Sequence, residues 1–484
     1  MKAKERVLKL LQAHGHHATS FQILEEGFKY WFDPTCDAVV AYVEVSGWWV
    51  AAAAPTAPEA LVGQVASRFI DAGRAASRKV AFFSVDEAFV VSLEAARGIK
   101  GFDKVKIGEQ PEWNPASYGT EGRQRRTLRS QLSRARRKGV TVRRVSAREI
   151  EETPGSIRAQ IDVVLDQWLE TRRMSAMRFM VDLQPFLFPE HRRYYMAQWE
   201  GRAVGFLAAI PVYKRQGWFF EDIIRVPGAP NGTTELMIHT AMEDAAHSGD
   251  RYVTLGLCPL AGVDDEPGPH RVLRRGLKAC YDHLGGLYQF PGLKNFKSRF
   301  CPDQWSPQFL VVSPPSMGVM AFGAVLRAFA GGGLVSFGLD TVLRLLARVP
   351  LKAWSWALVA FAVLLVPWTM LLAMADGVRW FGDVSIQQAW VTFDAAMVVA
   401  LGALAWVVRK GTPLGRLLAI FLAGATLTDF LLTTVQAMHL HQEASGWAMA
   451  FIAAGMAGPL LATVFLGTLA ACAPFKARPR RKRP

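Results

Sequence analysis

The chain has 484 residues, with 56 lysines and arginines against 41 aspartates and glutamates and a net charge of +15. A chain of this length is expected to form about two to four domains, and its charge favours anionic partners such as nucleic acid or an acidic lipid surface. The five cysteines are scattered without a C-x-x-C pair, which argues against a zinc site or a disulfide framework and favours reduced thiols. The amphipathic N-terminus has no uninterrupted apolar core, so we expect no signal peptide.

Residues 1–117 show strand and helix patterns in alternation and predict a first α/β domain. Apolar or alternating runs typical of strands lie at 38–45, 48–52 and 79–84. Helical spacing covers 58–75, where Pro58 suits the first turn because a proline loses no hydrogen bond there. A polar stretch with Pro111 and Pro115 follows and indicates a domain junction.

Residues 118–313 predict a second domain, which begins with an arginine-rich helix over 127–138. Eleven cations and no acid lie between Glu121 and Glu149. Apolar residues at i, i+4 and i+7 form an inward stripe, and Gly139 ends the helix. The outer faces carry Arg126, Arg129, Arg134, Arg136 and Arg137. An ordinary solvated face mixes both signs of charge, so we interpret this helix as anion-binding. Phosphates of RNA and of lipid both fit.

A strand, a glycine loop and a helix start follow in the same domain. The strand pattern at 217–223 ends near Asp222 and Arg225, and the helix pattern begins at 233. Free N–H groups and the helix dipole favour an anion at such a junction. The predicted cradle consists of Gly228, Asn231, Gly232 and Thr233, with Arg225 beside it. Two alternatives stay open: a sharp turn without a ligand, and a structural ion pair between Asp222 and Arg225.

Aromatic and basic residues alternate near the end of this domain, between 288 and 305. Lys294, Lys297 and Arg299 lie among tyrosine, phenylalanine and tryptophan residues. One interpretation is a final strand and turn packed on the core. The other is a basic pocket in which Lys297 meets developing negative charge.

The C-terminal part is predicted to cross a membrane four times, since about 20 apolar residues span the roughly 30 Å of hydrocarbon. Within 353–474, apolar stretches cover 354–375, 386–408, 417–438 and 447–473, and only Asp394 and Asp429 interrupt them with charge. Residues 314–352 are apolar but hold charges and a triple glycine, so we expect an interfacial linker on the lipid headgroups.

Positive charge falls on alternate sides of the four predicted spans. Arg344, Arg348 and Lys352 precede the first span, Arg409, Lys410 and Arg416 lie between the second and third, and the tail 475–484 adds six more cations. By the positive-inside rule, both this tail and the soluble part are expected in the cytoplasm, with the protein in the cell (inner) membrane.

Four segments together resemble a known family: QRRTLRSQLSRARRKG, DIIRVPGAPNGTTELM, VTLGLCPLAGV and LYQFPGLKNFKSRFCPDQWSPQFL. Their order and spacing over 20–312 are similar to the catalytic domain of the aminoacyl-phosphatidylglycerol synthases, the lysyl-phosphatidylglycerol synthetase or multiple peptide resistance factor family. That family usually has a longer membrane domain before its catalytic part, whereas here a short one follows.

The resemblance implies tandem N-acetyltransferase-like (GNAT) α/β domains that transfer an aminoacyl group from aminoacyl-tRNA to the headgroup of an anionic phospholipid such as phosphatidylglycerol. It assigns Asp222 and Arg225 to recognition of the aminoacyl and lipid-head groups and places Lys297 in the same pocket. The chemistry of the transfer makes Asp222, as a base or ammonium ligand, and Lys297, at the oxyanion, the candidate catalytic groups. The arginine-rich helix would face tRNA or lipid phosphate. Transfer from an activated ester needs no metal or cofactor, only positioning, a base and a cation near the oxyanion.

Two other functions remain compatible with the sequence. The first is a GNAT-type acyl-CoA-dependent acyltransferase, which would need a compact pyrophosphate loop where this chain has a longer one broken by prolines. The second is a non-catalytic, membrane-tethered module that binds tRNA or lipid. The amino acid, the lipid and the oligomeric state are not indicated by the sequence.

Overall fold

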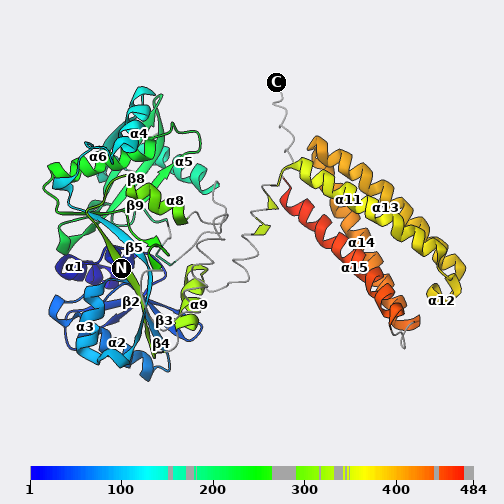
Figure 1. The fold of residues 1–484 in the computed structure, drawn as a ribbon, viewed down its shortest axis with the longest axis horizontal. Coiled ribbons are helices and arrows are strands. Elements are labelled where there is room, and N and C mark those ends of the chain that lie inside the picture. The colour runs from blue at the N-terminus through cyan, green and yellow to red at the C-terminus, as the bar shows by residue number, and fades with distance from the viewer. Residues whose placement is uncertain are drawn as a thin grey trace. The chain divides into compact units, whose positions relative to one another are not determined.

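The computed structural model describes residues 2–150, 156–170, 179–180, 183–263, 290–315, 318–331, 342–343, 346–347, 349–440 and 446–473. The chain divides into two compact units, Met1–Phe337 and Gly338–Pro484, and each is described by itself (Figure 1). The basic tail expected at 475–484 lies outside the described residues.

The N-terminal half of the first unit contains the predicted strands and helix close to their expected bounds. Its main elements are α1 (Lys2–His14), β1 (Lys29–Phe32), β2 (Val39–Val45), β3 (Trp48–Ala52), α2 (Val62–Ala75), β4 (Lys79–Val85), α3 (Glu87–Arg97) and β5 (Asp103–Trp113). Local chemistry explains the ends of α3: the Asp86 carboxylate accepts a hydrogen bond from the Phe89 N–H at 2.9 Å, and Gly98 follows the last turn with φ +77°.

The second half of this unit continues with further helices and strands. They are α4 (Arg126–Arg137), β6 (Thr141–Val145), α5 (Ile157–Glu170), β7 (Arg193–Trp199), β8 (Arg202–Val212), β9 (Gly217–Arg225), α6 (Thr233–His247), β10 (Tyr252–Thr254), β11 (Cys258–Pro259), α8 (Phe290–Ser298), β12 (Gln304–Ser313) and α9 (Gly318–Phe329). Helix α4, strand β9 and the start of α6 correspond to the helix, strand and helix start predicted for this half, and β7 lies where no element was predicted.

One mixed, 12-stranded sheet joins both halves of the first unit. Its order is β1-β2-β3-β4-β12-β5-β10-β9-β8-β7-β6, with β11 beside β5. The last strand, β12, inserts between β4 and β5, so the sheet runs without a break across the junction expected at 117/118. Strands β9 and β10 are parallel neighbours, and Phe219 lies opposite Thr254.

Helices cover this sheet and enclose three apolar clusters. Helices α4, α5 and α6 bury their apolar faces against β6 to β9, and α2 and α3 pack over the other half of the sheet; Figure 1 shows the two groups of helices over the two halves. A third cluster includes side chains of α1 and α9. The arginine-rich helix buries Leu128, Leu132 and Ala135, the stripe expected from its spacing.

Helix α9 lies within the predicted interfacial linker, and one of its faces packs on the sheet. Ala321, Ala324 and Val325 are buried in the cluster that includes β2 and β3, while Met320 and Leu326 are exposed. Small side chains allow this close packing on the strands. The face of α9 that packs on protein is therefore not available to lipid headgroups, and the remaining linker residues are only partly described.

The second unit consists mainly of long apolar helices. These are α11 (Leu351–Met374), α13 (Val384–Lys410), α14 (Pro413–Leu440) and α15 (Trp447–Cys472), with the short α12 (Gly377–Phe381) before α13. Among the described residues, these four long helices have the length and composition needed to cross a membrane, close to the predicted spans. Helix α11 packs on α13, and α14 packs on α15.

Candidate active site

Strand β9 carries two adjacent carboxylates at an irregularity in the sheet. Ala208 lies opposite Asp222 and Ala209 opposite Phe220, so Glu221 is the extra residue of a β-bulge. The Glu221 carboxylate forms an ion pair with Arg192 at 2.8 Å and accepts a hydrogen bond from Gln22 Nε2 at 2.7 Å. Both partners of the ion pair are buried, and so Glu221 is satisfied by the protein.

Asp222 follows Glu221 directly on β9 and lies next to this ion pair. Across the described residues we find no hydrogen bond or ion pair to its carboxyl group. Burial, and then the neighbouring charge of Glu221, raise the pKa of Asp222 well above its usual value, while Arg192 opposes the shift. A carboxyl group with an elevated pKa is suited to proton transfer.

Arg225 does not form the ion pair with Asp222 that was one of our alternatives. Its guanidinium donates a hydrogen bond to the Ala229 carbonyl at 3.1 Å and thereby braces the loop that follows β9. The side chain is only partly buried. Arg225 therefore shapes the loop and keeps some donors for a substrate.

The predicted anion cradle contains two structural residues and two accessible ones. Gly232 has φ +95°, and a Cβ there would lie 2.2 Å from the Gln131 carbonyl of α4, so glycine is required for α4 and α6 to approach. The Thr233 hydroxyl is buried and donates to the Pro230 carbonyl at 2.7 Å. Gly228 and Asn231 are exposed.

The first turn of α6 already holds a negative charge. The Glu235 carboxylate, which is buried, pairs with Arg299 at 3.2 Å. An acid in the first turn complements the helix dipole, which reduces the attraction that this helix start offers to a phosphate. The cradle is consequently weaker than the sequence pattern suggests.

Lys297 is buried on α8 and uses all three ammonium donors within the protein. Its Nζ donates to the carbonyls of Leu255, Gly256 and Leu257 at 2.7, 2.8 and 3.1 Å. Burial lowers the pKa of Lys297 to about 8, and Cys258 opposes the shift. Lys297 thus fixes the backbone just after β10, and the free cation that we expected at an oxyanion is already engaged.

The topology brings Asp222 and Lys297 to the same end of two neighbouring parallel strands. Beyond the Phe219–Thr254 pair, β9 continues to Asp222, while the chain after β10 turns at Gly256, whose φ is +74°. A Cβ at Gly256 would lie 2.6 Å from the Phe219 ring, so this turn is packed directly on β9. The carboxyl ends of parallel strands are where α/β folds generally bind substrates.

Four of the five selected arginines of α4 are exposed. Arg126, Arg134, Arg136 and Arg137 form no ion pair within the described ranges. Arg129 differs, because its guanidinium donates to the carbonyls of Thr120 and Gly122, both at 2.6 Å. Arg129 therefore anchors the segment before the helix, and the other four provide the surface charge.

Sequence reasoning missed the residues that set the environment of Asp222. Glu221 precedes it directly and could have been noticed as a second carboxylate. Arg192 and Gln22 come from distant segments, and no local pattern marks them. In the part of the chain that the structure covers, no group of three or more His, Cys, Asp or Glu residues could hold a metal ion.

The first unit is thus a mixed α/β sheet covered by helices, with a candidate site at the carboxyl end of β9. The sequence model of the family described as phosphatidylglycerol lysyltransferase, C-terminal, matches residues 8–312, and the chain belongs to this family. A phosphatidylglycerol lysyltransferase from Staphylococcus xylosus is 27% identical over 248 residues, which cover 48% of this chain and 26% of that protein. A lysylphosphatidylglycerol biosynthesis bifunctional protein from Nocardia farcinica is 26% identical and covers 50% of this chain and 21% of its own length.

Two solved structures share the fold of the first unit. The C-terminal domain of a protein from Agrobacterium fabrum, described as a lysylphosphatidylglycerol synthetase, has a TM-score of 0.58 at 20% identity and covers 69% of this chain and 98% of its own. A structure of L-PGS from Bacillus licheniformis has a TM-score of 0.55 at 18% identity, with 67% and 96% covered. The chain spans about a quarter of the curated relatives that it matches.

Proposed function

We propose that this protein is a membrane-bound aminoacyltransferase, which moves an aminoacyl group from aminoacyl-tRNA to the headgroup of a phospholipid such as phosphatidylglycerol. The main support is the family match over residues 8–312. This region includes Asp222, near the carboxyl end of β9, whose carboxyl group has no partner among the residues that the structure describes. The relatives that the chain resembles are named for lysyl transfer to this lipid.

The reaction exchanges one ester for another. A glycerol hydroxyl oxygen attacks the aminoacyl carbonyl carbon, the bond from that carbon to the ribose oxygen breaks, and the proton lost by the glycerol passes to the ribose oxygen. Asp222 is the candidate for accepting the glycerol proton or for holding the aminoacyl ammonium group. Its raised pKa, caused mainly by burial, suits proton transfer.

The cations of the proposed site divide into two groups. Lys297 acts as a positioning residue, because it holds the turn after β10 against β9. Arg225 retains donors for a phosphate, and the exposed Arg126, Arg134, Arg136 and Arg137 provide a surface for tRNA or lipid phosphates. The two exposed loop residues, Gly228 and Asn231, complete the proposed substrate side.

The orientation of the protein is part of the proposal. Alternate loop charges favour a cytoplasmic location for the first unit and the C-terminal tail, where aminoacyl-tRNA is available. Reporter fusions after Val349 and after Pro484 should both report the cytoplasmic side. Opposite sides would contradict the arrangement of four spans.

The transfer itself can be tested with the full chain in phosphatidylglycerol vesicles, supplied with a mixture of radiolabelled aminoacyl-tRNAs. Wild-type protein should produce labelled lipid, and Asp222→Asn should not. Label that appears equally with both proteins would overturn the role of Asp222. No labelled lipid from a folded wild-type protein with any aminoacyl-tRNA would overturn the proposed activity.

A further inference from the structure

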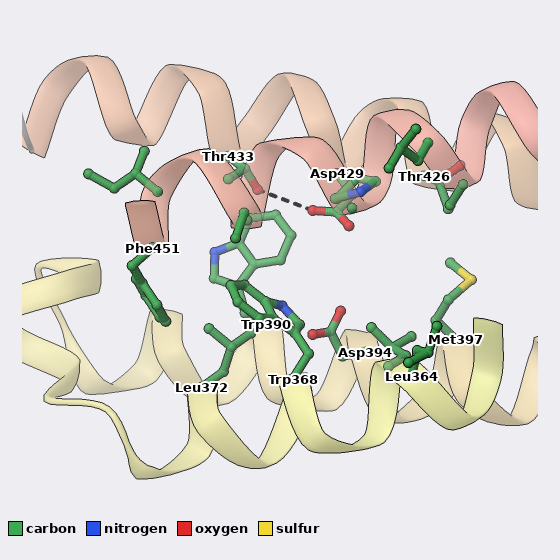
Figure 2. A pocket seen from close by; sticks show the side chains of 18 of the residues that line it. Leu364, Trp368, Leu372, Trp390, Asp394, Met397, Thr426, Asp429, Thr433 and Phe451 are labelled. Atoms are coloured by element: carbon green, nitrogen blue, oxygen red, sulfur yellow. Dashed lines mark hydrogen bonds between the residues drawn. The ribbon is translucent and has the colours of Figure 1, made fainter. Parts of the chain in front are cut away.

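The membrane unit contains a cavity of about 360 Å³ between its long helices. Aliphatic and aromatic side chains form most of its wall, including Trp368, Trp390 and Phe451, and two carboxylates enter it, Asp394 from α13 and Asp429 from α14. Figure 2 shows the two carboxyl groups facing each other across the cavity, with Trp368 and Trp390 beside them. The volume is in the range of small-molecule sites.

Asp394 is the most informative group of this cavity. Asp394 is only 6% exposed, and its Oδ2 atom has no hydrogen-bond partner among the described residues. Asp429 differs in that its Oδ1 accepts a hydrogen bond from Thr433 at 3.2 Å. A buried carboxylate oxygen aimed into a cavity without a partner indicates that something in the cavity can satisfy it.

Both carboxylates lie at a similar depth. Asp394 is ten residues from the start of α13, and Asp429 is eleven residues from the end of α14. At a rise of about 1.5 Å per residue, each is roughly 15 Å along its helix, near the middle of a hydrocarbon layer about 30 Å thick. Carboxylates at this depth are costly, by about 3 kcal/mol on insertion scales, and usually face a partner or a pathway.

The wall of the cavity favours an organic cation over a metal ion. Among the residues that line it, no lysine, arginine or histidine is present to pair with the carboxylates. A hard cation such as Mg²⁺ or Ca²⁺ needs about six or more oxygen ligands, whereas this wall is dominated by rings and aliphatic chains. Tryptophan faces attract ammonium groups, and two carboxylates add direct charge pairing.

A second unpartnered polar atom points to a ligand with hydrogen-bonding groups. The Gln436 side chain also lines the cavity; its Oε1 accepts a hydrogen bond from Trp390 Nε1 at 3.0 Å, while its buried Nε2 has no partner in the covered part of the chain. An amide donor near two acidic acceptors can bind an ester or alcohol oxygen that accompanies an ammonium group.

We propose that this cavity binds an organic ammonium group, held by Asp394 and Asp429 and flanked by the tryptophans. The group can come from a lipid headgroup that carries an amine or from a free, water-soluble amine. Only the first source rests on the proposed function, since an aminoacylated lipid would be the product of that transfer. The binding itself needs neither tRNA nor catalysis.

The test uses the full chain in lipid nanodiscs without tRNA. One set contains phosphatidylglycerol with synthetic lysyl-phosphatidylglycerol, and native mass spectrometry measures which lipid is retained. The other contains phosphatidylglycerol alone, and equilibrium dialysis measures binding of radiolabelled lysine methyl ester. Wild type should retain the amine, and Asp394→Asn and Asp429→Asn should each weaken retention at least about tenfold, since a buried charge loses its partner.

Control variants separate the effect of losing a carboxylate charge from the effect of losing the fold. Asp376→Asn changes a carboxylate at the start of α12, outside the cavity, and preserves the capping oxygen, so it should bind like wild type. Asp394→Glu keeps the charge and should retain binding better than Asp394→Asn. If the Asn variants do not fold, competition by unlabelled amine on wild-type protein, together with Asp394→Glu, decides the question.

The outcomes show whether a lipid or a soluble amine supplies the ammonium group, and whether the cation site exists at all. Retention of the lysyl lipid over phosphatidylglycerol supports the lipid source. Binding of the soluble ester alone, with the same dependence on both aspartates, supports a free amine. Absence of both, or binding that the Asp→Asn changes leave intact, overturns the cation site and leaves a shared proton as the role of the carboxylates. None of these results depends on whether the protein transfers an aminoacyl group.

Discussion

Several buried charges of the sheet unit have protein partners, whereas one buried carboxylate oxygen of the membrane unit has none among the described residues. In the sheet unit, Glu221 has Arg192 as its partner, Glu112 has Arg215, and Lys297 has three backbone carbonyls. In the described membrane helices, Asp394 has an oxygen without any partner. A buried charge that the protein satisfies holds the fold together, whereas one that it leaves unsatisfied points to a ligand. Asp222 differs from both: it is partly exposed, and its carboxyl group has no partner among the described residues.

The largest effect is expected from Asp222→Asn, which should lower aminoacyl-lipid formation about a hundredfold or more. The change preserves shape and removes the base or ammonium ligand. Initial rates in phosphatidylglycerol vesicles measure this, with the exposed Asp37→Asn as the matched control. Activity of Asp222→Asn within a few-fold of the control would mean that the Asp222 carboxyl group has no part in transfer.

Lys297→Met should mainly destabilise the sheet unit. It leaves three buried carbonyls without donors, at about 1 kcal/mol or more each, so the free energy of unfolding should fall by about 3 kcal/mol. Thermal melts of the full chain in detergent can follow the change. Lys294→Met, one turn earlier and paired with the Glu109 carboxylate near the surface, should lose less than about 1 kcal/mol. A stable Lys297→Met protein without transfer activity would instead indicate a direct catalytic role.

Gly232→Ala should destabilise the contact between α4 and α6. The added Cβ would meet the Gln131 carbonyl at 2.2 Å, and alanine is strained at φ +95°, which together should cost about 1–3 kcal/mol. Gly228→Ala is the matched control in the same loop, because nothing lies within 4 Å of its Cβ position. Equal melting temperatures for the two variants would show that the helices can move apart without penalty.

Replacing Arg126, Arg134, Arg136 and Arg137 with glutamine should weaken tRNA binding and reduce its salt dependence. Each lost phosphate contact should lower the slope of log affinity against log salt by about one unit. Arg143→Gln is the control, since that guanidinium is paired with Glu149. If tRNA affinity is unchanged while binding to anionic vesicles falls, the surface recognises lipid phosphate.

The smallest expected effect concerns the pH dependence of stability. The pKa of Asp222 is raised in the folded state, so the folded protein binds the proton more tightly than the unfolded chain does. The protonated Asp222 side chain therefore contributes its full stabilisation below the ordinary aspartate pKa of about 3.9. This stabilisation is lost as the pH rises through the pKa of Asp222 in the folded protein. Asparagine does not titrate, so the melting temperature of Asp222→Asn should change less between pH 4 and pH 7 than that of the wild type. Identical profiles would indicate that Asp222 titrates normally.

Most of the candidate site could be located from local patterns, but the roles of its residues could not. Asp222, Arg225 and Gly232 lie where the strand, loop and helix signals predicted. Whether Lys297 is free or engaged depends on the carbonyls of 255–257, about 40 residues earlier in the chain. Arg129 was selected as a phosphate ligand because its helical position is on an outer face, yet it turns back to the segment before the helix.

The sequence by itself determined the features that follow from periodicity and composition. The four apolar spans each depend on about 20 consecutive residues. The inward stripe of the arginine-rich helix and the helix start after the glycine loop depend on residues within a few turns of each other. Only the tertiary structure decided the insertion of β12 between β4 and β5, the Arg192–Glu221 ion pair and the facing of Asp394 and Asp429 across one cavity. Those features depend on pairings between distant segments, which are selected by packing and by the satisfaction of buried polar groups and leave no local repeat in the chain.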